Sequence, residues 1–361
     1  SVNISILIVA VVIFLLVIHH NFLSLSDFLR RELSDPSPLG LQPIDFIPAA
    51  PQRLTDERND KEISVVIAAS DERLGGAIAA MNSIYQHTRS NVVFHIVTLN
   101  DTVDHLRMWL RSPPLKDMRY RILDFDPHVL EGKVQVDPQK ADTFKPLTFA
   151  RFYLPNLVPH AEKVIYVDDD VIVQDDIVEL YNTPLKPGHA AAFSDDCDST
   201  SSKVAVRGAG NQVSFSLETI RKLAMKANTC SFNPGVFVAN LTEWKLQNIT
   251  KKLEKWMALN VVEELYSKTL AGSITTPPLL IVFYKQHSSI DPMWNVRHLG
   301  IAGKSYPPQF VEAAKLLHWN GHFKPWGRTA SYAEVWEKWY VPDPTGKFNL
   351  IRRHSEAYEA K

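Results

Sequence analysis

The stretch VIYVDDDVIV, residues 164–173, constrains the fold of this chain more than any other feature. Two runs of aliphatic and β-branched residues, which favour buried strands, flank three consecutive aspartates. Adjacent carboxylates repel one another, and partial burial makes that repulsion worse. A bound divalent cation would remove this cost. The pattern therefore predicts a buried strand that ends at a cation site, and the alternative is a solvated acidic turn that caps the next segment.

The spacing of the aspartates predicts which of them bind the same ion. Side chains at i and i+2 leave a strand on the same side, so Asp168 and Asp170 converge while Asp169 points away. Their oxygens suit Mn²⁺ or Mg²⁺. A rival interpretation stays open, because D-x-D-x-V after an apolar strand also resembles the start of haloacid-dehalogenase-type phosphatases, with Asp168 as nucleophile. That motif normally opens its domain, whereas three predicted strands precede it here.

Strand-like and helix-like patterns alternate along the first half of the chain. Strands are predicted at residues 63–69, 91–99, 120–125, 163–167 and 189–194, and helices at 73–88, 102–110, 149–157, 241–266 and 332–340. This alternation predicts an α/β fold with a largely parallel sheet and helices on both faces. Ligands bind such sheets beyond the carboxyl ends of the strands, where the turn Ser70-Asp71-Glu72 and the aspartates lie.

Two classes of partner are disfavoured. Neither G-x-G-x-x-G nor G-x-x-x-x-G-K-[ST] occurs, so a dinucleotide or P-loop site is not expected. The formal net charge is -1 over 361 residues. Nucleic acid is therefore not expected as a partner, because no excess of basic residues is available to neutralise its phosphates.

The N-terminal segment is predicted to hold the chain at a membrane. Residues 2–18 carry no charge and would rise about 25 Å as a helix, which is enough for a thin bilayer. No A-x-A-like cleavage site follows, so residues 1–23 are predicted to be a signal anchor, rather than a cleaved signal or a buried core helix. The proline-rich residues 24–60 are predicted to be a stem, residues 61–345 a globular domain, and residues 346–361 a tail.

Two cysteines and three sequons bear on the compartment. Cys197 and Cys230 either pair in an oxidising lumen or remain two buried free thiols. Triplets that begin at Asn100, Asn240 and Asn248 are candidates for N-glycosylation. With the anchor and the stem, the sequons favour a single-pass protein whose globular domain is lumenal.

A second stretch with site chemistry is LLHWNGHFKPW, residues 316–326. It holds His318, Gly321 and Lys324 in the order H-x-x-G-x-x-K-P-W. A histidine completes a metal shell through a ring nitrogen. A glycine lets backbone approach a phosphate closely, and a lysine supplies a point charge to a diphosphate.

Together these motifs resemble family 8 of the retaining glycosyltransferases, from about residue 63 to residue 340. The resemblance implies a GT-A fold, which is a Rossmann-like, mostly parallel central sheet flanked by helices. It also implies a UDP-sugar donor and Mn²⁺, with Mg²⁺ as the alternative ion. Within the family, the anchor and stem resemble the animal glycosyltransferase 8 domain-containing group of single-pass type II Golgi proteins. We therefore expect a lumenal catalytic domain in the Golgi, acting on an acceptor that is a glycan, a protein or a lipid.

The resemblance also implies roles for individual residues. Asp168, Asp170 and His318 hold Mn²⁺ against the UDP diphosphate, and residues 68–72 form the uridine-binding turn. The residues implied in catalysis are Asp168, Asp170, Lys324 and Arg151. Those implied in nucleotide or donor binding are Ala68, Ala69, Ser70, Glu72, Arg151, Asp169, Asn233, Gly235, Gly321 and Lys324.

Two short matches concern the donor sugar. The run Thr148-Phe-Ala-Arg151 resembles the family's T-x-A-R, whose arginine reaches the sugar, although Arg151 is alternatively a charge on a helix surface. The run FNPG at residues 232–235 resembles the family's F-N-x-G, in which Asn233 faces the sugar and Gly235 lets the backbone pass close to it. Asp195 and Asp196 are candidates for contacts to sugar hydroxyls, or else belong to a solvated loop.

One loop departs from the family pattern. Where relatives such as glycogenin carry Asp-Gln, this chain has Thr276-Pro277-Pro278-Leu279-Leu280, so a covalent intermediate there is not expected and internal return is favoured. The predicted activity is that of a UDP-sugar-dependent hexosyltransferase acting with retention. The alternatives are a non-catalytic scaffold that binds UDP-sugar, favoured by the Pro277-Pro278 loop, and the phosphatase.

Overall fold

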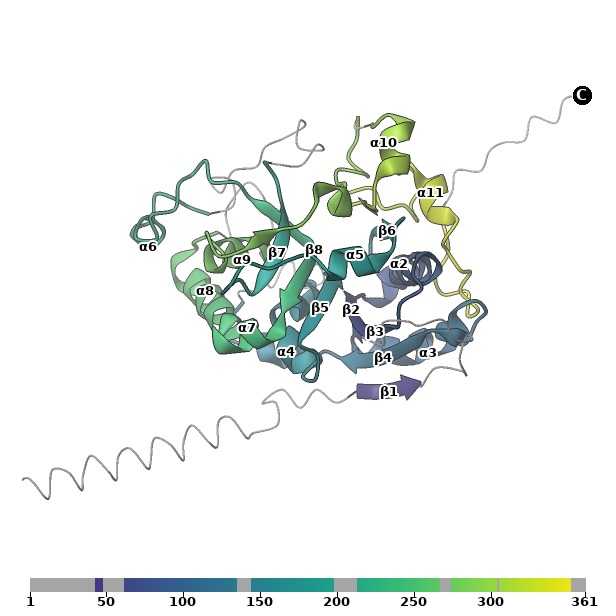
Figure 1. Ribbon diagram of the computed structural model, residues 1–361. Helices are drawn as coiled ribbons and strands as arrows, with labels where there is room; N and C mark the ends of the chain where they lie inside the picture. Colours follow the sequence, from purple (N-terminus) through teal and green to yellow (C-terminus); the bar gives the residue numbers. More distant parts are fainter. Residues whose placement is uncertain are drawn as a thin grey trace, which may run out of the picture. The chain divides into compact units, whose positions relative to one another are not determined.

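The computed structural model describes residues 43–47, 62–134, 144–197, 213–266, 274–303 and 305–351 (Figure 1). All of them belong to one compact unit, Leu41–Lys361. The predicted anchor at residues 2–18 lies outside the described residues, as does the predicted stem apart from residues 43–47. Within the described part of the chain, no helix combines the length and the apolar character needed to cross a membrane.

Eight strands of the described chain form one sheet, in the order β1-β4-β3-β2-β5-β8-β7-β9 (Figure 1). Their bounds are β1 Pro43–Ile47, β2 Ile63–Ala68, β3 Val92–Thr98, β4 Arg119–Asp124, β5 Lys163–Val167, β7 Ala191–Asp195, β8 Phe232–Asn240 and β9 Ser288–Ser289. Strands β4, β3, β2 and β5 are mutually parallel. Both β2 and β3 are buried along their whole length, as expected of strands covered on both faces. The predicted α/β class with a mostly parallel sheet is confirmed.

The described chain forms helices in each predicted stretch, and it also forms short helices that the sequence patterns did not predict. They are α2 Leu74–His87, α3 Val103–Leu110, α4 Leu154–Leu157, α5 Ile177–Tyr181, α6 Glu218–Arg221, α7 Leu241–Leu246, α8 Ile249–Glu263, α9 Thr276–Val282, α10 Pro308–Ala313 and α11 Ala333–Glu337. A single helix over residues 149–157 was the wrong prediction, because a 3-10 helix at Pro146–Phe152 precedes the short α4. Pro155 has no N–H to bond the carbonyl of Arg151, so an α-helix does not continue from the preceding residues, and Pro155 lies instead in the first turn of α4.

One strand runs against its neighbours. Strand β8 is antiparallel to both β5 and β7, so its first residues lie beside the last residues of those strands. The N–H of Asp168, just after β5, donates to the carbonyl of Gly235 at 2.7 Å. The carboxyl ends of β2, β5 and β7 therefore share one edge of the sheet with the amino end of β8.

A two-stranded sheet brings the C-terminal motif to the same edge. Strand β6, Val171–Val173, pairs antiparallel with β10, Leu316–His318, and His318 stands opposite Val171. Trp319 and Trp336 are completely buried in the hydrophobic cluster that packs this segment. The apolar residues that follow the aspartates, Val171–Val173, are thus the strand that pairs with β10.

The globular unit extends past both predicted domain bounds. Strand β1 lies in the predicted stem, yet it pairs antiparallel with β4. Phe348 lies in the predicted tail, yet it is only 7% exposed and its ring fills the space beside Gly75 of α2. The domain is therefore longer than residues 61–345, because segments from both ends pack onto it.

Candidate active site

Three side chains converge where β5, β6 and β10 meet. Ligand atoms of Asp168, Asp170 and His318 all lie within 4.8 Å of one another. The Nε2 atom of His318 is 3.0 Å from Oδ1 of Asp170 and 3.8 Å from Oδ2 of Asp168. The sequence prediction of these three residues as one metal-binding group therefore agrees with their positions.

The hydrogen bonds around His318 determine which ring nitrogen faces the aspartates. Asn295 donates through Nδ2 to Oδ1 of Asn233 at 3.2 Å, and its own Oδ1 lies 2.9 Å from Nδ1 of His318. An amide oxygen only accepts, so Nδ1 of His318 carries a proton and Nε2 presents a lone pair. A hydrogen bond to the ring nitrogen that does not bind the metal commonly orients a metal-binding histidine.

Two atoms of this group are buried and unsatisfied. Among the described residues, Nε2 of His318 and Oδ1 of Asp170 have no hydrogen-bond partner. Burying two such atoms together is costly unless a cation or a proton lies between them. One imidazole nitrogen and two carboxylates form a donor set suited to Mn²⁺ or Mg²⁺. These residues therefore fit the divalent ion that the sequence predicts.

Lys324 reaches the same group from the loop after β10. Its Nζ donates to Oδ2 of Asp170 at 2.5 Å and to the carbonyl of Trp319 at 2.8 Å. Burial by itself would raise the pKa of Asp170, but its close contacts with His318, Lys324 and Arg73 lower that pKa well below its usual range. The Lys324 ammonium thus lies beside Asp170 of the triad, and its predicted contact with a diphosphate stays a prediction.

Asp169 points away from the triad and binds Arg73, which the sequence did not single out. The Nε of Arg73 donates to Asp169 at 2.6 Å, and its Nη2 contacts both Asp169 and Asp170. Its guanidinium also lies over the ring of Trp326, 5.2 Å from the centroid. The only signal available was that Arg73 follows the polar turn directly.

Arg151 is a buried link between the 3-10 helix and the triad. It is 6% exposed, which excludes the alternative of a surface charge. Its Nη2 donates to Oδ1 of Asp168 at 2.8 Å and its Nη1 to the carbonyl of Pro234 at 2.7 Å. It therefore orients Asp168 and holds the start of β8 in place.

Gly235 is required by the triad itself. A Cβ at this position would lie 2.4 Å from Oδ2 of Asp168 and 2.5 Å from Cε1 of His318. Oδ1 of Asn233 accepts from the N–H of Gly235 at 3.0 Å, so the turn presents Asn233 next to the metal ligands. Both residues therefore lie beside the triad, and their contact with a donor sugar stays a prediction.

Gly321 has a packing role that the prediction did not foresee. A Cβ there would lie 2.3 Å from the backbone of Gly300, so the space beside it is filled by protein. Its N–H donates to the carbonyl of Leu299 at 3.1 Å. The glycine permits close contact between two loops, and the structure gives no direct support for a phosphate there.

A cavity of about 420 Å³ opens beside the triad. Its walls include Asp168, Asp169 and Arg151 together with Ala68, Ser70 and Glu72 of the predicted uridine turn. Ala69 was predicted to line the same site, but it is 1% exposed and its backbone bonds to Val97 and Thr98. Ala69 therefore supports the turn from inside.

The structure also shows the positions of the cysteines, the Pro277-Pro278 stretch and the sequons. Cys197 and Cys230 form a disulfide with a Cα–Cα distance of 5.7 Å. The Pro277-Pro278 stretch opens α9 and is buried. Among the sequons, Asn100 and Asn248 are exposed, whereas the side chain of Asn240 accepts from the N–H of Glu243 and caps α7.

The sequence is similar to that of a family of transferases. Residues 64–330 match the family described as Glycosyl transferase family 8. Glycosyltransferase 8 domain-containing protein 1 of Bos taurus is 71% identical over 368 residues, covering 100% of this chain and 99% of the relative. The Homo sapiens protein of that name is 70% identical with the same coverage. Glycosyltransferase 8 domain-containing protein 2 of Bos taurus is 49% identical, covering 83% of this chain and 88% of the relative.

Solved structures show the same fold at low sequence identity. The galactosyltransferase LgtC, in complex with donor and acceptor sugar analogs, superimposes with a TM-score of 0.56 at 19% identity, covering 78% of this chain and 98% of its own. The bifunctional glycosyltransferase WbbM in its apo form gives a TM-score of 0.58 at 20% identity, covering 81% of this chain and 52% of its own. This likeness establishes the GT-A fold.

Proposed function

The chain belongs to glycosyl transferase family 8, and from this premise we propose that it transfers a sugar, with retention, from a UDP-sugar to an acceptor hydroxyl, with Mn²⁺ held by Asp168, Asp170 and His318. Membership in the family removes the phosphatase alternative, because the aspartates lie within the matched residues 64–330. The coarser conclusion, a glycosyltransferase with a GT-A fold, does not depend on the proposed ion or donor.

The observation that carries the proposal is the pair of unsatisfied atoms in the triad. Nε2 of His318 and Oδ1 of Asp170 face each other at 3.0 Å beside a cavity of about 420 Å³. A divalent ion bound there would neutralise charge on the diphosphate of a nucleotide sugar. Asp168, which lines the cavity, connects the ion site to the space for the nucleotide.

The protein's own cations assist departure of the nucleotide. In retaining transfer, the acceptor oxygen bonds to the anomeric carbon while the bond from that carbon to the diphosphate oxygen breaks. The acceptor's proton passes to the departing diphosphate. Lys324 lies where it can stabilise the charge that grows on the diphosphate, and Arg151 keeps Asp168 in position through its 2.8 Å hydrogen bond.

The buried start of α9 supports internal return over a covalent intermediate. Pro277, Pro278, Leu279 and Leu280 are buried there and offer no nucleophile. The same loop also supports a second candidate function, namely that of a scaffold that binds UDP-sugar without transferring it. Turnover distinguishes the two, because the scaffold binds UDP and Mn²⁺ but releases no UDP.

We also propose that the domain works in the Golgi lumen behind the signal anchor at residues 2–18. The Cys197–Cys230 disulfide supports an oxidising compartment. The exposed Asn100 and Asn248 are compatible with glycosylation there. Endoglycosidase treatment of the full chain from a cell membrane fraction would test this, and a soluble secreted chain that starts near residue 24 would contradict it.

The direct test of function combines binding with turnover. Calorimetry of the full chain with UDP, with and without Mn²⁺, should show binding that depends on the ion. Incubation with a panel of UDP-sugars should then release UDP faster when an acceptor mixture is present. Binding without release in every combination would favour the scaffold, and absence of ion-dependent UDP binding would refute the proposal.

A further inference from the structure

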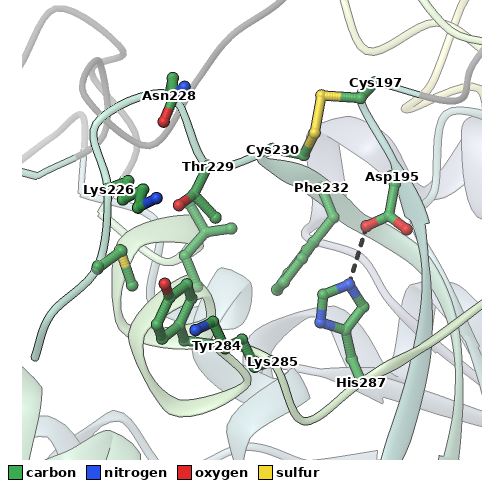
Figure 2. Close-up of a pocket in the computed structure, with 12 residues that line it drawn as sticks. Asp195, Cys197, Lys226, Asn228, Thr229, Cys230, Phe232, Tyr284, Lys285 and His287 are labelled. Atoms are coloured by element: carbon green, nitrogen blue, oxygen red, sulfur yellow. Dashed lines mark hydrogen bonds and ion pairs between the residues drawn. A yellow bond between two sulfur atoms is a disulfide. The ribbon is translucent and has the colours of Figure 1, made fainter.

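A second cavity, of about 500 Å³, lies further along the same edge of the sheet. It is lined by Asp195 at the end of β7 and Phe232 at the start of β8 (Figure 2). Phe232 adjoins Asn233, which is two residues before the Gly235 that abuts the metal ligands. The nucleotide cavity, the triad and this second cavity therefore follow the strand order β2-β5-β8-β7.

The walls of the second cavity are held rigidly. The Cys197–Cys230 disulfide joins the segments that follow β7 and precede β8. His287 and Ser289 both donate to Asp195, at 2.8 and 2.6 Å. Figure 2 shows the His287–Asp195 contact, the disulfide, and Phe232 and Tyr284 among the lining residues. Such an arrangement of aromatic faces with fixed polar groups is typical of a small-ligand site.

His287 contributes a positive charge to this wall. Its Nδ1 lies 3.0 Å from the carbonyl of Phe283, and its Nε2 lies 2.8 Å from the carboxylate of Asp195. Both partners accept, so both ring nitrogens donate and the ring is an imidazolium. That charge is balanced by Asp195, and the pair leaves the cavity wall neutral.

Two lysines make the cavity electropositive. Lys226 and Lys285 are exposed and line the space. Among the described residues neither forms an ion pair, and Lys285 instead lies 5.1 Å from the centroid of the Tyr284 ring. Of the described residues that line this cavity, Asp195 alone is a carboxylate, and His287 already balances it. A ligand with a negative charge would therefore be attracted.

We propose that this cavity binds an anionic sugar unit, such as a hexuronate, whose carboxylate is recognised by Lys226 and Lys285. The inference deepens the proposed function and rests on it, because it assigns the unit to the transfer reaction. The carbons of the sugar would lie against the partly exposed side chain of Tyr284, because Phe232 is buried and stacked on Phe193. The unit belongs either to the acceptor or to the donor's own sugar, since the cavity follows the triad along the same edge of the sheet.

The experiment compares ligands that differ only in this charge. Benzyl β-D-glucuronide and benzyl β-D-glucoside are titrated against the full chain by ligand-observed NMR, which represents the acceptor source. UDP-glucuronic acid and UDP-glucose are titrated with Mn²⁺, which represents the donor source. Each titration is repeated with the variant Lys226→Gln/Lys285→Gln. The control is Lys252→Gln/Lys255→Gln, which removes the same charge from exposed positions on α8.

We expect the anionic member of at least one pair to bind about five- to tenfold more tightly than its neutral partner, as two partly screened charges would give. The cavity variant should lose this preference and the α8 variant should keep it. Preference in the glycoside pair assigns the unit to the acceptor, and preference in the UDP-sugar pair assigns it to the donor. Equal binding within both pairs, or a preference that survives in the cavity variant, overturns the proposal.

Failure of the proposed function would be visible separately. Affinity for UDP with Mn²⁺ is measured on each protein and does not involve this cavity. A chain that binds no UDP but still prefers the glucuronide through its two lysines would refute the transferase proposal and retain the anionic site.

Discussion

Two pairs of aspartates follow strands on either side of β8, and their surroundings differ. After β5, Asp170 Oδ1 and His318 Nε2 face each other without hydrogen-bond partners among the described residues. After β7, Asp195 receives hydrogen bonds from His287 and Ser289, and Asp196 pairs with Arg297. Asp170 also accepts from Lys324 and Arg73, but only through Oδ2, so its Oδ1 stays without a donor. Both carboxylate oxygens of Asp195, in contrast, accept from side chains of the protein.

This difference shows what makes an acidic strand end a candidate metal site. Both pairs lie at the same edge of the sheet, so position alone does not distinguish them. The unsatisfied atoms do, because Oδ1 of Asp170 lacks a donor, whose place a cation could take, whereas both oxygens of Asp195 already have one. The sequence candidates Asp195 and Asp196 are therefore assigned to the wall of a cavity and to packing.

The largest expected effect comes from exchanging one carboxylate in each pair. Asp170→Asn should weaken Mn²⁺-dependent UDP binding by about 4 kcal/mol, close to a thousandfold, because a buried charged ligand is lost. Asp195→Asn should leave UDP affinity within a few-fold of the wild type. Calorimetry with UDP and Mn²⁺ measures both, and thermal melts confirm that each variant folds. Equal losses of UDP affinity in the two variants would contradict the assignment of only the first pair to an ion site.

The cations of the two pairs should differ in what their loss affects. Lys324→Ala should reduce turnover about a hundredfold, as for loss of a group that stabilises transition-state charge, with a small change in melting temperature. Arg297→Met should mainly lower the melting temperature, because Arg297 is 2% exposed and pairs with Asp196 inside the protein. UDP release and thermal melts on both variants provide the check. If Lys324→Ala only destabilises, the segment at residues 316–326 packs the domain and does no chemistry.

A smaller effect is expected from the residue that orients His318. Asn295→Ala should lower Mn²⁺ affinity about tenfold, the low end for loss of a partner behind a metal ligand. Asn295→Asp should restore part of that affinity, because a carboxylate also accepts from Nδ1. Electron paramagnetic resonance of free Mn²⁺ reports the affinity without any substrate. Equal affinity in the alanine variant and the wild type would show that the tautomer is set by other contacts.

The smallest effect concerns the pH dependence of the second pair. Burial raises the pKa of Asp195, but hydrogen bonds from His287 and Ser289 outweigh it and lower that pKa below 3.8. Burial lowers the pKa of His287, but its bonds to Asp195 and Phe283 outweigh it and raise that pKa above 6.5. The stability from Asp195 is lost as pH falls through its folded pKa, and that from His287 is lost as pH rises through its folded pKa.

The pair should therefore stabilise the fold most between about pH 4 and pH 6.5. His287→Gln should cost about 1 kcal/mol of unfolding free energy in that window, the typical net contribution of one intramolecular hydrogen bond. The cost should shrink at higher pH. Urea unfolding across the pH range measures it, with the exposed His128–Glu131 pair as a control expected to contribute less. A cost that is constant with pH would mean that His287 is neutral.

Much of the fold was predictable from local patterns. The strands that became β2, β3, β4, β5 and β7 were each predicted within a few residues, because continuous apolar runs report strands buried on both faces. The exception near residue 155 came from overlooked proline chemistry. The β1 strand and the burial of Phe348 were missed, because pairing at an edge strand and packing of a terminal aromatic depend on distant partners.

Within the candidate site, local sequence identified residue types better than it identified roles. Arg73 was read as part of a helix, although it binds Asp169, and Asn295 had no signal at all. Gly321 was assigned to a phosphate, although it packs against Gly300. The residues next to a side chain in the sequence do not indicate which distant residue it will contact in the folded protein.

By itself, the sequence determined the α/β alternation, the strand that ends in aspartates and the convergence of Asp168 with Asp170, because hydrophobic period and i, i+2 geometry act over a few residues. The tertiary structure decided which distant groups meet them. Lys324 lies 154 residues from Asp170, and the β6–β10 pairing brings the two together. The antiparallel β8 sets Asn233 beside the triad, and packing closes the Cys197–Cys230 disulfide. Those contacts depend on burial summed over the whole core, which no short stretch of sequence contains.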